Sequence, residues 1–167
     1  MVITRSRPRI PKSYGIEASD AGMLDWAEVA GTLASSHLFW VSTVTPVGGP
    51  HLIPIWGAWV DEAAYLEGGD DTRWARNLAQ GDGRVHLGAD RGGTQVMVRG
   101  TATQVELPGD LQREVADAYE AKYPYRPTGT RFTRITPSHV LAWRTDTVEA
   151  FGSTPTQFDF GGSDEGR

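Results

Sequence analysis

Hydrophobic and polar positions alternate over much of the chain, and this pattern predicts a protein built mainly from short strands. Residues 37–45 and 51–60 are rich in aromatic and β-branched side chains, and the turn PVGGP at 46–50 joins them as a hairpin. A short third strand is expected at 63–67. Strands that follow one another without a regular strand–helix–strand alternation favour an antiparallel sheet or barrel over a parallel one.

Further strands are expected in the second half of the chain. Residues 84–89 alternate, and 94–106 form a long strand in which Gly100 indicates a bulge or a close backbone approach. Residues 134–146 supply the last one or two strands. Roughly six short strands joined mostly by hairpins predict a closed or half-closed antiparallel barrel of the Greek-key type.

Three segments have the features of helices. Ser19 or Asp20 can cap a helix over 20–35, and 71–80 reads as a short helix that ends at the sequence GDG. Asp110–Tyr123 carries apolar residues at helical spacing. The predicted fold is therefore mainly β with flanking helices.

The chain is expected to hold one domain. Its 167 residues suffice for one hydrophobic core and leave little room for a second. Residues 1–18 contain two prolines and no apolar period, which predicts an N-terminal arm, and 19–150 form the barrel domain. Residues 151–167 are rich in Gly, Ser, Thr and Asp and predict a loosely held C-terminal tail in which Phe151, Phe158 and Phe160 could dock.

Composition excludes several classes of protein. An apolar fraction of 39% and a charged fraction of 22% are those of a globular chain. No apolar run is long enough to span a bilayer, and the first residues lack the apolar stretch of a secretory signal. The lack of cysteine removes disulfides, thiolate catalysis and cysteine-ligated metals, and it favours a cytoplasmic location.

Charge and motif spacing narrow the chemistry further. A net charge of −5 argues against broad nucleic-acid binding, and the basic cluster at 5–12 fits a solvated arm better than an RNA contact. The four histidines are scattered without paired spacing, so no metal site is expected. No nucleophile motif and no P-loop is found, and no residue is assigned a catalytic role.

One stretch combines residues suited to an anionic ligand. Two extended segments lead through the turn GGDD to a helix start that reads TRWARNL. The N–H groups and the positive dipole end at the start of a helix favour phosphate. Arg73, Arg76 and Asn77 lie at spacings i, i+3 and i+4 and are expected to share one helix face, with Thr72 at the helix start.

The order of elements resembles that of a known family. An apolar strand, a Gly-Pro turn, a strand reading P-x-x-x-P-x-W and a helix start close to Thr/Ser-Arg-Lys-x-Arg-Asn-Leu follow one another in FWVSTVTPVGGPHLIPIWGAWVDEAAYLEGGDDTRWARNLAQGDGRVHLGA. Together with the later strand VMVRGTATQVE, this order resembles the pyridoxamine 5′-phosphate oxidase-like family of flavin-binding split β-barrels. The resemblance covers roughly residues 10–145 and rests on the conjunction of motifs.

The resemblance implies a cofactor and a partner. Family members form homodimers that bind FMN or the deazaflavin F420 at the interface between barrels, and a few bind haem instead. The flavin ring is then expected beside the strand at 53–57, and its phosphate at the helix start. The residues implied to contact the cofactor are His51, Ile53, Pro54, Ile55, Trp56, Gly57, Thr72, Arg73, Arg76 and Asn77.

Three residues depart from the family pattern at the helix start. Trp74 stands where members usually carry a second cation. Asp70 and Asp71 place two negative charges immediately before the expected phosphate site, and their presence would repel a phosphate. Because Asp is a good helix N-cap, one of them also has a structural explanation.

The tryptophans have structural as well as functional explanations. Trp56 and Trp59 lie three apart on one predicted strand and are expected to point to opposite faces, one into the barrel and one towards a flavin or a second subunit. Trp40 and Trp143 are expected in the core.

The sequence thus leads to two hypotheses of different classes. The first is an oxidoreductase that uses FMN or F420 to transfer a hydride to or from a small unsaturated substrate, which agrees with the absence of a nucleophile motif because the cofactor carries the chemistry. The alternative is a non-catalytic split-barrel protein that carries flavin or haem, or that has lost its cofactor.

Overall fold

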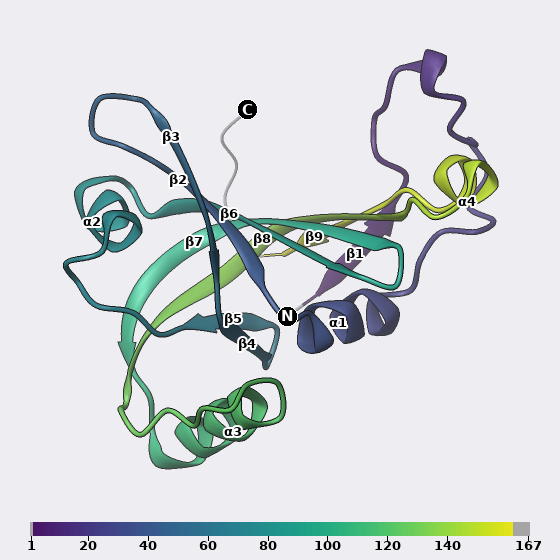
Figure 1. The fold of residues 1–167 in the computed structure, drawn as a ribbon. Coiled ribbons are helices and arrows are strands. Elements are labelled where there is room, and N and C mark those ends of the chain that lie inside the picture. The colour runs from purple at the N-terminus through teal and green to yellow at the C-terminus, as the bar shows by residue number, and fades with distance from the viewer. Residues whose placement is uncertain (1, 162–167) are drawn as a thin grey trace.

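Inward-facing apolar residues alternate with exposed residues along most strands of the computed structural model, which describes residues 2–161 (Figure 1). The strands within these residues are β1 (Ile3–Ser6), β2 (Phe39–Val44), β3 (Pro50–Ile55), β4 (Gly57–Val60), β5 (Ala63–Leu66), β6 (Arg84–Arg91), β7 (Thr94–Glu106), β8 (Arg131–Arg144) and β9 (Thr156–Phe160). The helices are η1 (Lys12–Tyr14, a 3₁₀ turn), α1 (Trp26–Ser35), α2 (Arg73–Gln80), α3 (Gly109–Glu120) and α4 (Val148–Ser153).

All strand pairs are antiparallel, and the sheet runs in the order β1-β9-β8-β7-β6-β2-β3. The long strand β8 pairs with β7 along one edge, while its other edge pairs with β5 at 133–135 and with β9 at 139–142. Among the described residues, β3 pairs only with β2 and β4 only with β5, so the barrel is split rather than closed. The predicted fold class, a mainly β antiparallel split barrel with flanking helices, is confirmed.

The core consists of two apolar clusters. The larger lies between the sheet and α1 and includes Leu33, Phe39 and Ile135. The smaller lies against α3 and includes Tyr65 and Phe132. Figure 1 shows α3 below β4 and β5, and α2 beside the β2–β3 hairpin at the opposite end of the barrel wall.

The predicted single strand over 51–60 is wrong, because the chain breaks at Trp56 into β3 and β4, which pair with different strands. A Cβ on Gly57 would lie 2.6 Å from Leu66 and 2.7 Å from Phe39 side-chain atoms, so only glycine fits the corner. At this corner the chain passes from β3, which pairs with β2, to β4, which pairs with β5.

The interpretation of Gly100 in β7 is confirmed. The register between β7 and β8 shifts between Arg99 and Gly100. A Cβ on Gly100 would collide with the backbone carbonyl of Thr136 on β8. Glycine thus allows the two long strands to cross at close range.

The predicted helix over 20–35 is too long at its N-terminus. Helix α1 begins at Trp26, and Asp25 rather than Ser19 or Asp20 is its N-cap. Tertiary contacts hold the preceding residues outside a helix: Gly22 has φ +82°, and the N–H of Leu24 donates to Oγ1 of Thr156 at 2.8 Å. The helix predicted over 110–123 is observed as α3, which ends three residues earlier than expected, at Glu120.

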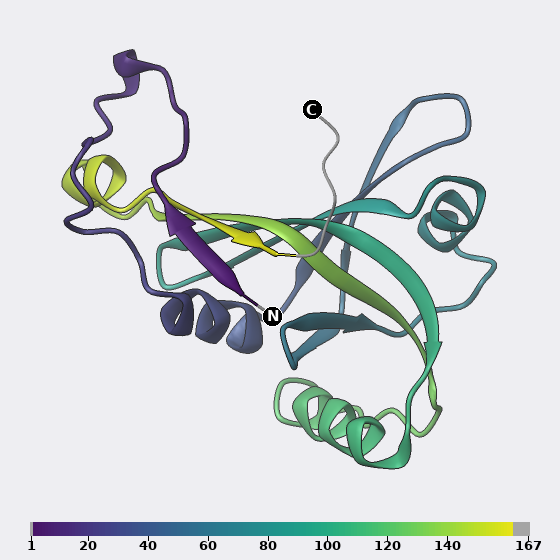
Figure 2. The same ribbon diagram turned by 180° about the vertical axis from the view of Figure 1, so that it is seen from behind.

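The expectation of an irregular arm and a loosely held tail is wrong for two segments. Figure 2 shows β1 beside β9, and these strands pair from Ile3 with Phe160 to Ser6 with Gln157. The expected docking of Phe158 and Phe160 is confirmed, since both are buried with ring centroids 5.2 and 5.1 Å from that of Trp26. The part of the predicted tail at 162–167 lies outside the described residues, and the domain boundaries at 18 and 150 stay a prediction.

None of the helices in the described part of the chain is long and apolar enough to cross a membrane.

Candidate functional site

Helix α2 begins at a capped N-terminus. Oγ1 of Thr72 accepts a hydrogen bond from the N–H of Ala75 at 3.4 Å and donates one to the carbonyl of Gly69 at 2.9 Å. The remaining N–H groups of the first turn have no acceptor within the helix, and the positive end of the helix dipole lies with them. This end of α2 therefore has the properties of an anion site.

Two guanidinium groups lie on the exposed side of α2. Arg73 and Arg76 are exposed, and within residues 2–161 neither side chain has a hydrogen-bond or ion-pair partner. Asn77 does not share their face: it is 4% exposed, and its Nδ2 donates to Oγ1 of Thr43 on β2 at 2.9 Å. The prediction of a common face thus holds for the two arginines and is wrong for Asn77.

Trp74 points away from the arginines and into the core. It is 3% exposed and belongs to the larger apolar cluster. Its ring lies so close to Gly68 that a Cβ there would be 2.7 Å from the indole Cζ2. Trp74, at the position where the family pattern has a second cation, is thus a packing residue. Arg73 and Arg76 are the only cationic residues of α2.

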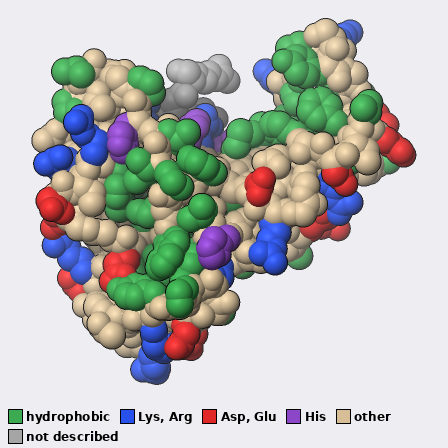
Figure 3. Space-filling model, in the orientation of Figure 1, with side chains coloured by type: hydrophobic (Ala, Val, Ile, Leu, Met, Phe, Trp, Pro, Cys, Tyr) green, Lys and Arg blue, Asp and Glu red, His purple; other side chains and the backbone are tan. Residues whose placement is uncertain are grey.

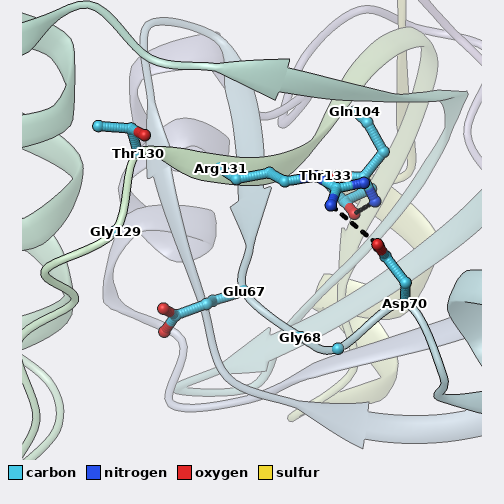
Figure 4. Close-up of a pocket in the computed structure, with 9 residues that line it drawn as sticks. Glu67, Gly68, Asp70, Gln104, Gly129, Thr130, Arg131 and Thr133 are labelled. Atoms are coloured by element: carbon cyan, nitrogen blue, oxygen red, sulfur yellow. Dashed lines mark hydrogen bonds and ion pairs between the residues drawn. The ribbon is translucent and has the colours of Figure 1, made fainter.

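The acidic turn before α2 is partly neutralised. Asp70 Oδ2 lies 2.8 Å from a guanidinium nitrogen of Arg131, the first residue of β8. Figure 4 shows these side chains pointing toward one another across a hollow, with Glu67 on its other side. The two acids that precede the predicted phosphate site are therefore not equivalent, since Asp70 has a cationic partner.

The hollow has a volume of about 730 Å³. Its walls come from the turn after β5, from β7 and from the start of β8 (Figure 4). Within it, the side-chain amide of Gln104 donates to Oγ1 of Thr133 at 2.9 Å. The lining residues are Glu67, Gly68, Gly69, Asp70, Gln104, Gly129, Thr130, Arg131 and Thr133.

Strand β3 carries several of the residues that the sequence predicts beside a flavin ring. Its second edge pairs with no strand in the part of the chain that the structure describes, so the carbonyls of Pro50, Leu52 and Pro54 and the N–H of Leu52 are open to a ligand. Ile53 and Ile55 are half-buried, whereas Pro54 is exposed. Nδ1 of His51 lies 3.4 Å from Oγ1 of Thr43, so His51 faces the same polar group as Asn77.

The corner between β3 and β4 is held by residues from beyond α3 that the sequence analysis did not single out. Trp56 is 40% exposed, and its ring stacks on Tyr123 at 4.5 Å and 12°. The N–H of Gly57 donates to the Tyr123 hydroxyl at 3.1 Å, and the carbonyl of Gly57 accepts from Nζ of Lys122 at 2.6 Å. The backbone of Gly57 is therefore already engaged, while the ring of Trp56, which also lies 6.4 Å from that of Tyr125, remains partly exposed.

Trp56 and Trp59 differ in exposure, as expected, since Trp56 is 40% exposed and Trp59 only 7%. The expectation that Trp40 lies in the core is wrong: Trp40 is 49% exposed, because Phe39 and Val41 occupy the inward positions of β2. Trp143, expected in the core, is only half-buried.

An apolar surface covers the outer face of the hairpin. Exposed hydrophobic side chains from neighbouring strands meet there, and Figure 3 shows hydrophobic side chains gathered over β2 and β3 and continuing toward α3. A second hollow of about 440 Å³ opens on this face beside Trp40 and Met97. The exposed hydrophobic residues on these strands are Trp40, Val44, Leu52 and Met97.

The histidines stand apart in the fold as they do in the sequence. Nδ1 of His139 lies 2.7 Å from Oδ1 of Asp159, and this pair joins β8 to β9. Within residues 2–161, no three His, Cys, Asp or Glu side chains are grouped so that they could hold a metal ion.

The family model described as pyridoxamine 5′-phosphate oxidase matches residues 26–144. A conserved hypothetical protein from Mycobacterium tuberculosis, Rv2991, is 27% identical with a TM-score of 0.63, and the match covers 75% of this chain and 88% of that one. A protein described as F420 reductase is 20% identical with a TM-score of 0.52, covering 66% of this chain and 93% of that one. No curated protein sequence matches significantly.

The fold and the family match agree on one class. The match spans α1 to the end of β8, which includes the hairpin, the corner at Trp56 and the start of α2. The chain belongs to the pyridoxamine 5′-phosphate oxidase family, and its fold is a split barrel like that of the similar structures.

Proposed function

We propose that this protein is an oxidoreductase that binds FMN or the deazaflavin F420 and acts on a small unsaturated substrate. The observation that carries the proposal is the pair of uncommitted guanidiniums, Arg73 and Arg76, at the capped start of α2. An F420 reductase is among the proteins of similar fold, which supports a deazaflavin as strongly as a flavin.

The residues at the start of α2 fit a phosphate group. Arg73 and Arg76 offer planar forks of donors, and the free N–H groups of the helix start add neutral donors beside them. Asp70 opposes an anion less than its position suggests because Arg131 pairs with it. Asp71 remains a nearby negative charge, so we expect moderate affinity that falls as salt rises.

The edge of β3 and the ring of Trp56 fit a planar ring system. The carbonyl of Pro54 on the open edge of β3 would accept from the polar edge of the ring, and the exposed part of the Trp56 ring would pack against a flat ligand. A bound flavin or deazaflavin would supply the hydride chemistry, while these residues bind and orient it.

We further propose that the working unit is a homodimer. Trp40, Val44, Leu52 and Met97 expose a contiguous apolar surface on the sheet face beside the proposed site. Surfaces of this kind mark association sites in proteins of this size. A second copy on this face would exclude water from a ring bound along β3.

The alternative function is a non-catalytic carrier of a flavin or haem, or a family member without a cofactor. The burial of Trp74 favours this alternative, because it leaves the exposed face of α2 one cation short of the family pattern. The two functions differ in whether a bound cofactor is reduced and reoxidised with turnover.

Titration with FMN and F420 tests the proposal. The protein, first scanned from the near-ultraviolet to the red, is titrated with each cofactor at low and at moderate salt. Micromolar binding of either cofactor that weakens with salt, followed by substrate-dependent oxidation of the reduced cofactor, supports the oxidoreductase. A Soret band, or binding without turnover on any electron-poor alkene or quinone, supports the carrier, and no binding overturns both cofactor proposals.

The dimer is tested separately by light scattering on a sizing column. Trp40→Glu places a charge on the apolar face while leaving the core untouched, since Trp40 is half exposed. We expect the wild type to elute as a dimer and the variant as a monomer. A wild type that is monomeric at micromolar concentration contradicts the proposal.

A further inference from the structure

Lys122, just beyond the C-terminal end of α3, carries an amine that is largely buried and has no carboxylate near it within residues 2–161. Its Nζ donates to the carbonyl of Gly57 at 2.6 Å and to that of Ser36 at 3.2 Å. The same nitrogen lies 5.2 Å from the ring centre of Phe39 and 5.4 Å from that of Tyr123. A lysine placed this deep usually has an acidic partner, so carbonyls and ring faces alone are an uncommon set of contacts.

The contacts of Lys122 join four segments at the β3–β4 corner. Ser36 is the C-cap of α1, Phe39 begins β2, and Gly57 begins β4. The Tyr123 hydroxyl adds to the same corner by donating to the carbonyl of His37 at 2.8 Å while it accepts from the N–H of Gly57. The amine therefore lies where the chain turns from β3 into β4.

Trp56 immediately precedes this point. Its carbonyl lies 3.2 Å from the Tyr119 hydroxyl, which also accepts from the N–H of Glu67 at 3.0 Å. Its ring stacks on Tyr123. The backbone on both sides of the indole is thus held by residues at the end of α3, and its open face can adopt one orientation only while these contacts persist.

We propose that Lys122 is a positioning residue for Trp56, and that its protonated amine holds the β3–β4 corner so that the open face of the indole is presented to a flat ligand. The hold weakens when the amine loses its proton. The presentation of Trp56 to a flavin rests on the proposed function, whereas the effect of Lys122 on the corner does not.

The contacts by which Lys122 holds the β3–β4 corner are stronger when its amine is charged than when it is neutral. An ammonium has three donors and makes charge-assisted hydrogen bonds, which are about twice as strong as neutral ones. A neutral amine keeps two donors and loses the attraction of the two ring faces. Burial lowers the pKa of Lys122 to about 8, and no neighbouring charge opposes this shift. Lys122 therefore loses its proton in a range of pH that is easily reached in solution.

The other titratable groups around the corner behave differently. Burial raises the pKa of both Tyr119 and Tyr123, so their hydroxyls keep their protons throughout this range. Tyr125, whose ring centroid lies 6.4 Å from that of Trp56, donates to a carboxylate oxygen of Glu67 at 2.8 Å, and this hydrogen bond raises the pKa of Tyr125. His37 is a further titratable neighbour, with its ring 5.2 Å from that of Tyr123. On the outer side of α3, the charged groups are Asp117 and Glu120, and both pair with Arg126. His37 is accordingly the group that a control must remove.

Fluorine NMR of cofactor-free protein labelled with 5-fluorotryptophan tests the proposal. The Trp56 resonance is assigned by its absence in Trp56→Phe, and the spectrum is followed from about pH 6 to 9.5. We expect the Trp56 resonance to move with a midpoint near pH 8 in the wild type and in His37→Gln. The movement should be absent in Lys122→Met and in Lys122→Arg, whose guanidinium stays charged.

Each outcome decides the matter. A Trp56 resonance that does not move around pH 8 in the wild type, or that moves equally in Lys122→Arg, overturns the proposal. If Lys122→Met fails to fold, the wild type and Lys122→Arg still give the comparison. Near-ultraviolet circular dichroism of each variant at pH 7 checks that the fold is retained.

A second measurement separates this proposal from the proposed function. The dissociation constant for FMN and F420 is measured at pH 7 and pH 9 in the wild type and Lys122→Arg. We expect several-fold weaker binding at pH 9 in the wild type and a smaller change in the variant. A pH-dependent Trp56 resonance in a protein that binds no flavin would leave the role of Lys122 in place and overturn the flavin function alone.

Discussion

Asp70 and Arg131 form an ion pair at 2.8 Å that ties the turn before α2 to the first residue of β8. The two side chains both line the hollow of about 730 Å³, and Arg131 partly neutralises one of the two negative charges that precede the candidate phosphate site. Arg73 and Arg76 are left without such a partner among the described residues. The electrostatics of the site therefore depend on a residue that is distant in sequence from the motif.

Arg73→Ala should weaken flavin binding without lowering thermal stability. Arg73 has no hydrogen-bond or ion-pair partner within residues 2–161, so its truncation breaks no polar contact of the fold. A hydrogen bond to a charged group contributes roughly 1.5–3 kcal/mol, which corresponds to a loss of about tenfold or more in affinity. Isothermal titration with FMN and F420, together with thermal unfolding, measures both quantities.

The matched control for that variant is Arg113→Ala, which removes an exposed arginine from α3, far from the site. It should leave affinity unchanged. Unfolding of Arg73→Ala at lower temperature with unchanged affinity would place Arg73 in a structural role and contradict the proposed phosphate site.

Arg131→Gln should weaken flavin binding indirectly, because it restores the full charge of Asp70 beside the phosphate. Since the pair is more than half exposed, we expect only about two- to fivefold weaker binding and a stability change below about 1 kcal/mol. Adding Asp70→Asn to Arg131→Gln should recover the affinity. If the double variant binds no better than Arg131→Gln, the effect of Arg131 is not electrostatic.

The sequence predicted the fold well where local pattern decides it. Alternation along β2 and β6, the turn at PVGGP and the capped start of α2 all depend on neighbouring residues. The pattern also indicated the close approach at Gly100. It could not reveal which face of β2 is the core, because Trp40 is as apolar as Phe39 and Val41.

Contacts between distant segments account for the rest. Gly57 and Tyr123 are 66 positions apart, and no local pattern relates a lysine after α3 to the corner of a hairpin strand. Helical spacing alone predicts that Asn77 shares a face with Arg73 and Arg76. No local pattern indicates the hydroxyl of Thr43 on β2, which accepts from the buried amide of Asn77. The C-terminal strand was missed because its turn-rich composition hides the alternating Phe158 and Phe160.

Asn77→Ala should destabilise the protein by about 1–3 kcal/mol, because it leaves the hydroxyl of Thr43 without its buried donor. Thr43→Val removes the other partner, and the double variant should cost less than the sum of the two. Urea unfolding of the four proteins gives the coupling. Additive losses would mean that the hydrogen bond contributes little, and lost flavin affinity in a stable Asn77→Ala would favour direct contact with the cofactor.

Gly100→Ala should destabilise the protein by about 1–3 kcal/mol, since its Cβ would collide with the backbone of β8 at Thr136. Gly31→Ala is the control: nothing lies near its Cβ position on α1, and alanine should stabilise this helix by about 0.5–1 kcal/mol. Thermal and urea unfolding compare the two. Equal effects of the two substitutions would contradict the close approach of β7 and β8.

The stability of the wild type should rise between about pH 8 and pH 10 relative to that of Lys122→Met. The pKa of Lys122 is lowered to about 8 in the folded protein from 10.5 in the unfolded chain. Between these values the unfolded chain binds more protons, so the free energy of unfolding increases with pH, by at most about 1.4 kcal/mol per pH unit for one group.

This direction is opposite to the predicted loosening of the Trp56 corner, which separates a positioning role from a purely structural one. Above pH 10 the difference should level off, while the stability of each protein alone falls, because burial raises the pKa values of Tyr65, Tyr119 and Tyr123 and the unfolded chain then releases their protons first. Urea unfolding at half-unit intervals from pH 7.5 to pH 10 gives the difference between the two proteins, in which other titrating groups cancel. A difference that stays flat across this interval would show that Lys122 is not buried enough to change its pKa, and the pH-dependent hold on Gly57 would fail with it.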